Sequence, residues 1–152
     1  MVFRLREERE SPVVATYKSL HDEDLSFDEL IERLESPSAR LLEATALFLV
    51  ELARLGDIPR PKISDYHQAT RRLGFIAERL STHPELPESV QKRLKAFADQ
   101  LYANLAAPPA ENLGFSKTTS PARIRRLQRH ADAIDERWRV WGQVDLRVEF
   151  LQ

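Results

Sequence analysis

The residues with the clearest chemical potential form a run of basic side chains in the last third of the chain, here called the basic segment. Its members are Lys117, Arg123, Arg125, Arg126, Arg129 and His130. Guanidinium groups suit bidentate contacts with phosphate or carboxylate oxygens. The N–H groups of a helix start, with Thr118 and Thr119 beside them, would add donors for an anion. The basic segment therefore predicts contact with a nucleic-acid backbone or an acidic protein surface.

A single long helix is expected to position these side chains. Ser120 can cap its first N–H groups, and Pro121 suits the first helical position. Apolar residues then recur three and four apart, as in a packed helical seam. They are Ile124, Leu127, Ala131, Ile134, Trp138 and Trp141. With this seam toward the core, Arg125, Arg126 and Arg129 fall on the solvent side.

The alternative for the same helix is a face that is merely solvated. Asp132, Asp135 and Glu136 follow the basic segment and could neutralise it, for instance by an ion pair between Asp135 and Arg139. Cations in the first turns of a helix oppose its dipole by a few tenths of a kcal/mol each, roughly. Placing several there is thus unfavourable unless a partner uses them.

The spacing of Arg125 and His130, with four residues between them, resembles the Arg–x4–6–His motif of the HEPN superfamily of small helical proteins. Arg123 with His130, and Arg60 with His67, fit the same spacing. The resemblance implies an all-helical ribonuclease in which the Arg and His act on a ribose 2′-hydroxyl across a dimer. Arg126 stands where that family usually has a polar residue after the Arg.

The rest of the chain predicts a mainly α fold, a single-domain bundle of five to six helices with a short carboxy-terminal strand. Its centre is expected to be a helix over Ser36–Gly56, which Ser36 caps and Gly56 ends in a left-handed conformation. This helix is apolar nearly all round and so should be buried on several sides. Residues 26–34 are expected to form a short helix before it, with Leu30, Ile31 and Leu34 facing inward. Two helices follow, beginning near Ser64 and Pro87, as an antiparallel hairpin. Residues 144–150 alternate as a strand does, with residues 2–6 or another chain as its partner.

Residues 13–58, which contain SFDEL and TALFLVELARLGDI, are similar to the winged-helix domain of bacterial kleisins, the bridging subunits of chromosome-condensing complexes. The resemblance implies a winged-helix-like amino-terminal half that binds a protein, beside a helical bundle half over residues 64–142. Prolines follow Ile58 where the wing would come. The preceding helix is too apolar to read bases in a DNA groove.

Composition excludes several classes of protein. The chain has 152 residues, no cysteine and a net charge of −1, so thiol chemistry, zinc-finger spacing and a generally basic nucleic-acid binder are excluded. His67 and His83 have no second ligand at helical spacing, and we expect no metal and no cofactor. Charges in the first eleven residues favour the cytoplasm over a secretory route, with no membrane association.

These features predict a non-enzymatic interaction subunit of a larger complex, with a protein partner or a second copy of the chain and with RNA or DNA backbone at the basic segment. Two alternatives stay open. One is a HEPN-like ribonuclease that uses Arg125 and His130. The other is a protein–protein adaptor whose contacts are the carboxy-terminal strand and the seam that carries the tryptophans.

Overall fold

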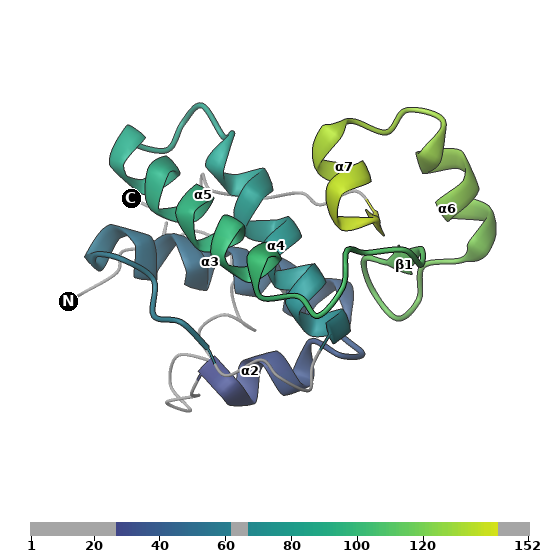
Figure 1. Ribbon diagram of the computed structural model, residues 1–152, viewed down its shortest axis with the longest axis horizontal. Coiled ribbons are helices and arrows are strands. Elements are labelled where there is room, and N and C mark those ends of the chain that lie inside the picture. Colours follow the sequence, from purple (N-terminus) through teal and green to yellow (C-terminus); the bar gives the residue numbers. More distant parts are fainter. Residues whose placement is uncertain (1–26, 62–66, 143–152) are drawn as a thin grey trace, which may run out of the picture.

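A computed structural model describes residues 27–61 and 67–142 of the chain (Figure 1). The two terminal strands expected over residues 2–6 and 144–150, and the first part of the winged-helix-like half, lie outside these residues. The described part is mainly helical with a short two-stranded sheet near its carboxy-terminal end, which confirms the predicted fold class. None of the described helices is both long and apolar enough to span a membrane.

Six helices and two strands make up the described residues. They are α2 (Phe27–Arg33), α3 (Ala39–Leu55), α4 (His67–Ser81), α5 (Glu88–Ala103), β1 (Leu113–Gly114), α6 (Pro121–Gln128), α7 (Ala133–Trp138) and β2 (Val140–Trp141). The inward residues predicted for the short α2 are all buried, namely Leu30, Ile31 and Leu34. The expected short helix ahead of the long apolar one is therefore confirmed.

The element that most others contact is α4, whereas the sequence favoured α3 as the centre. Helix α4 packs against α2, α3, α5, α7 and β2. Every residue from Ala69 to Ala77 is buried, so α4 is covered on all sides. Helix α3 is largely buried as expected, but Leu41, Phe48 and Leu52 are only partly covered and Leu55 is 56% exposed. The centre of the bundle thus lies one helix later in the chain.

The start of α3 differs from the one expected, whereas its end agrees. The N-cap is Ser38, whose hydroxyl accepts the Leu41 N–H at 3.2 Å, so Ser36 and Pro37 precede the helix. Gly56 ends α3 as predicted, but its φ of 160° is extended rather than left-handed. The helix is therefore capped two residues later than Ser36, because it is the Ser38 hydroxyl that accepts the Leu41 N–H.

Helices α4 and α5 form the antiparallel hairpin that the short connection predicts. The residues that their three-four spacing places inward are buried, from Ala69 to Leu80 on α4 and from Val90 to Leu101 on α5. Leu105, predicted on the same face, follows α5 and is only partly buried, and Tyr66 lies outside the described residues. The hydroxyls of Ser81 and Thr82 donate to the carbonyls of Glu78 and Arg79, which satisfies acceptors in the last turn of α4. The turn is therefore fixed by side chains as well as by its length.

The sequence predicted a single last helix over residues 121–141, and this prediction is wrong. The chain instead forms α6, a turn, α7 and then β2. The break lies at Asp132, whose carboxylate accepts the Asp135 N–H while the Asp135 carboxylate accepts the Asp132 N–H. Aspartate is more favourable as a helix cap than inside a helix. This reciprocal cap starts a new helix where the apolar spacing alone predicts a continuous one.

The two strands are parallel, with Leu113 opposite Val140 and Gly114 opposite Trp141. The N–H groups of Leu113 and Phe115 donate to the carbonyls of Arg139 and Trp141 at 3.0 and 2.8 Å. This pairing closes the irregular segment after α5 onto the end of α7. Trp141, expected in a helical seam, is instead a buried strand residue.

Trp138 fits against α4 because α4 has a glycine at the contact. A Cβ built on Gly74 would lie 2.1 Å from Cη2 of Trp138. The indole is fully buried, and the ring of Tyr102 on α5 packs edge-on against it at 5.2 Å. Helix α7 therefore docks on the hairpin through the Trp138 side chain, which fits because Gly74 of α4 has no side chain.

We predict that Gly74→Ala lowers the free energy of unfolding by about 1–3 kcal/mol, since the added methyl group overpacks the Trp138 site. The loss should occur although alanine gains about 1 kcal/mol over glycine in a helix interior. Urea titration followed by circular dichroism measures it. Gly56→Ala is the matched control, because nothing lies within 4 Å of its Cβ. A Gly74→Ala protein as stable as wild type would contradict the Trp138 contact.

Candidate nucleic-acid interface

The helix that carries most of the basic segment is short and lies at the outer edge of the molecule, with α7 between it and the α4–α5 hairpin in the view of Figure 1. Ser120 is its N-cap and Pro121 its first residue, as predicted. Arg129 is the C-cap. The six basic residues therefore lie before α6, on it and directly after it.

The predicted division of α6 into an inner and an outer side is confirmed. Ile124 and Leu127 are partly buried, whereas Arg123, Arg125, Arg126 and Arg129 are exposed, as are Lys117 and His130. No residue of α6 is fully buried, and the helix packs on β2. The four arginines, which we call the basic face, thus project from a thinly packed element.

Because α6 is short, its arginines lie differently relative to the helix dipole than the sequence suggested. Arg125 and Arg126 lie in its last turn, not in the first turns of a long helix. Cations near a helix C-terminus are favoured by the dipole. The expected conflict with the helix dipole is therefore absent for Arg125 and Arg126, whereas Arg123, in the first turn, still opposes the dipole.

The helix start offers less to an anion than the sequence suggested. The Ser120 hydroxyl already accepts the Arg123 N–H at 3.2 Å, and Pro121 has no N–H. The hydroxyls of Thr118 and Thr119 both lie within hydrogen-bond distance of Ser116. Most donors that a phosphate would use there are thus occupied, so the arginine side chains carry any anion contact.

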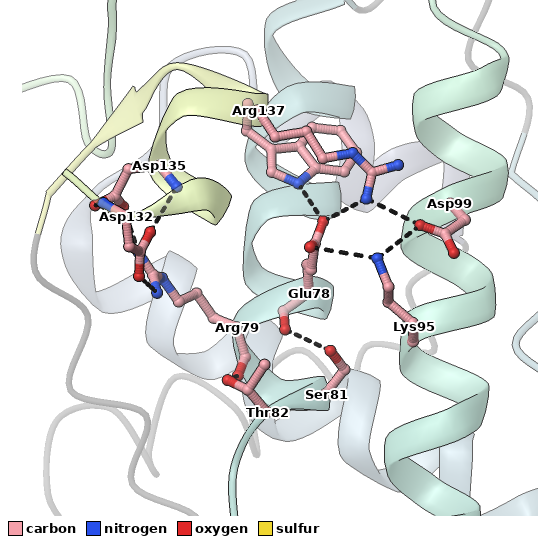
Figure 2. A network of polar contacts seen from close by, with 10 residues as sticks. Glu78, Arg79, Ser81, Thr82, Lys95, Asp99, Asp132, Asp135 and Arg137 are labelled. Carbon is pink, nitrogen blue, oxygen red and sulfur yellow. Dashed lines mark hydrogen bonds and ion pairs between the residues drawn. The ribbon is translucent and has the colours of Figure 1, made fainter.

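The acids expected to neutralise the basic face are paired elsewhere. Arg79 of α4 forms ion pairs with Asp132 and Asp135, as Figure 2 shows. The expected pair of Asp135 with Arg139 is wrong, since Arg139 instead lies 4.0 Å from Glu136. Within the described residues, no ion pair is formed by the arginines of the basic face. In the alternative of a merely solvated face, these acids were expected to neutralise the arginines. The structure pairs Asp132 and Asp135 with Arg79 instead.

A second network fixes α7 on the hairpin. Glu78, almost fully buried, accepts from Arg137 at 2.7 Å and from the indole N–H of Trp138 at 2.9 Å. Lys95 lies 3.4 Å from the same carboxylate, and Lys95 and Arg137 both contact Asp99 (Figure 2). Burying a carboxylate is costly unless it is paired and hydrogen-bonded in this way. Arg137 and Lys95 therefore both serve to hold α7 on the hairpin.

Two further arginines that the sequence did not single out are buried in α4. Arg71 donates to the carbonyls of Glu111, Trp138 and Arg139, and Arg72 to those of Leu34, Glu35 and Gly114. The spacing of Arg72, three residues after Ala69 and four before Ile76, would have placed it on the inward face of the helix. Arginine in a helix is usually read as exposed, so both were missed.

The HEPN-like pair lies on two different local structures. Arg125 is on α6, while His130 follows the C-cap in the turn before α7. Both side chains are exposed. A cleavage site formed by them remains a prediction. The described residues hold no group of three or more His, Asp or Glu side chains placed to bind a metal ion.

Comparison with known proteins gives no relative for the chain: no family model, no curated protein and no solved structure matches it. The resemblances to kleisins and HEPN proteins therefore stay predictions. The functional argument depends on the geometry and charge of the site itself.

We predict that the Arg79 ion pairs make stability depend on acid. Hydrogen bonds from Arg79 hold the pKa of Asp132 below its usual 3.8, and burial offsets this only in part. A carboxyl whose pKa is lower in the folded state stabilises the fold above the unfolded pKa, and loses that contribution as the pH falls through the folded value. The free energy of unfolding should therefore decrease as the pH falls from about 5 to below 3.8.

Asp132→Asn tests this, because asparagine keeps the helix cap but removes the charge. Its stability should be lower than wild type near neutral pH and should decrease less on acidification. Asp57→Asn, at an exposed position, is the control and should follow wild type. Parallel pH profiles for wild type and Asp132→Asn, from urea titrations, would show that Arg79 and Asp132 are not coupled.

Proposed function

We propose that the protein is a non-enzymatic subunit of a larger complex that contacts nucleic-acid backbone through the basic face of α6. The observation that carries the proposal is the free state of Arg123, Arg125, Arg126 and Arg129, which are exposed and form no ion pair within the described residues. Other arginines nearby, such as Arg79 and Arg137, are held in ion pairs.

Charge along the sequence supports the proposal. No aspartate or glutamate stands between Glu111 and Asp132, a stretch with five lysines and arginines in a chain of net charge −1. A positive patch on an otherwise balanced chain attracts a polyanion locally. Positive charge is therefore concentrated on α6, which has no fully buried residue.

The absence of large hydrophobic side chains on the exposed side of α6 favours phosphate over an acidic protein. Protein interfaces usually have an apolar, aromatic-rich centre. Here Ile124 and Leu127 face inward, and Leu55 on α3 is the large hydrophobic residue exposed among the described residues. Arginines without an apolar centre suit a backbone that is bound for its charge and not read for its sequence.

We predict that Arg125→Glu with Arg129→Glu weakens binding to a labelled single-stranded RNA at least about tenfold, because each reversal replaces an attraction by a repulsion. Fluorescence anisotropy over a salt series measures it. The wild-type log affinity should fall linearly with log salt, with a slope of about 0.7 per phosphate contacted. The double variant should have a smaller slope.

Arg60→Glu with Lys92→Glu is the matched control. It makes the same change in net charge at two exposed positions outside α6. Its affinity should stay within about twofold of wild type if the contact is local. Equal losses in both double variants would mean that only net charge matters, and no binding at low salt would refute the proposal.

The same assay separates the alternatives. Shortening of the RNA by wild type, lost in His130→Ala, would indicate the HEPN-like ribonuclease. Our proposal expects intact RNA and unchanged binding of His130→Ala. Absence of RNA binding together with capture of an acidic protein through Arg125 and Arg129 would place the interface on a protein partner.

A further inference from the structure

One side-chain oxygen near the basic face accepts hydrogen bonds from more donors than it has lone pairs. The Asn112 amide oxygen lies 3.3 Å from Gln128 Nε2, 2.7 Å from Arg139 Nη2 and 3.0 Å from Trp141 Nε1. These donors come from α6, the end of α7 and β2. A carbonyl oxygen has two lone pairs, so three donors leave this corner short of acceptors.

Arg139 is the least satisfied of these donors. Its Nε–H is buried and has no hydrogen-bond partner within the described residues. Its nearest carboxylate, that of Glu136, is 4.0 Å away. Its backbone is also left-handed, with φ 51° and ψ 42°, at a C-cap where glycine or asparagine is usual. Backbone strain and unmet donors at one residue are typical of sites kept for function.

The corner adjoins the basic face. Gln128 belongs to α6, and Arg125 lies one turn before it on the same side of the helix. The side chain of Arg139 is 29% exposed, so part of its guanidinium can be reached from solvent. A group that enters here would meet the donors of Gln128 and Arg139 together, with Arg125 beside them.

We propose that this corner, formed by Asn112, Gln128, Arg139 and Trp141, is a subsite for a single phosphate group. A phosphate brings several acceptor oxygens to a place where donors outnumber acceptors, and a guanidinium matches its geometry. The inference builds on the proposed function, because a phosphate of the nucleic-acid backbone is the expected occupant. Free inorganic phosphate has the same chemistry, and the test separates the two.

The two tryptophans of the chain provide a direct test. The Trp141 indole N–H belongs to the corner, whereas that of Trp138 donates to the buried Glu78 and serves as the internal control. In ¹⁵N–¹H spectra of the whole chain, inorganic phosphate added at constant ionic strength should shift the Trp141 indole peak saturably. The Trp138 peak should not move. A single-stranded RNA should shift the same peak at lower concentration.

A charge change at the shared acceptor tests the corner in binding. Asn112→Asp places a carboxylate against Arg139 and should weaken RNA binding about tenfold, with a salt slope smaller by about one phosphate. Gln100→Glu makes the same chemical change on the exposed side of α5 and should bind like wild type. Asn112→Asp should unfold at the same or a higher temperature, since its carboxylate can accept from Arg139.

The outcomes distinguish this inference from the proposed function. If Arg125→Glu with Arg129→Glu abolishes RNA binding while Asn112→Asp matches Gln100→Glu, the proposed function stands and the subsite is refuted. If RNA does not bind but phosphate shifts the Trp141 peak, the subsite holds for free phosphate and the proposed function fails. A Trp141 peak that moves with neither phosphate nor RNA refutes the subsite.

Discussion

The interaction on which the rest of the structure depends is the burial of Arg71 and Arg72 in α4. Desolvation lowers the pKa of both groups, that of Arg72 to about 10, so both remain charged near neutral pH. Their partners are backbone carbonyls from the end of α2, from the segment around β1 and from the end of α7. A buried charge without such partners is very costly. The three segments must therefore dock on α4 together.

This arrangement explains why the basic face is free. Helix α7 docks on α4 with Asp132 and Asp135 at its start paired with Arg79. Glu78 and Asp99 hold Arg137 in the same way. The acids nearest in sequence to the basic face are thereby used inside the fold. The arginines of α6 are left without counter-charges because of how the core is built, and this connects the architecture to the proposed function.

Periodicity and turn residues were enough to predict α2 to α5, since each has an apolar face and a short or proline-containing boundary. They failed at Asp132, where the apolar spacing continues through a helix break. The paired aspartates three residues apart were a capping signal that outweighs the spacing. Site prediction found the exposed arginines, because Ile124 and Leu127 fix the orientation of α6. It missed Arg71 and Arg72, whose partners are distant backbone carbonyls, and the contact of Arg139 with the Asn112 side chain, none of which a local pattern reveals.

The weak packing of α6 is consistent with a role in binding. With no fully buried side chain, α6 depends on its caps, on its partly covered apolar residues and on the Gln128 contact to hold its place against β2. A ligand that bridges Gln128 and Arg139 would join α6 to the end of α7. A ligand that binds only the folded state stabilises it by RT ln(1 + [L]/Kd). If a phosphate binds there as proposed, the stabilisation should be largest at the junction of α6 and α7, where donors outnumber acceptors.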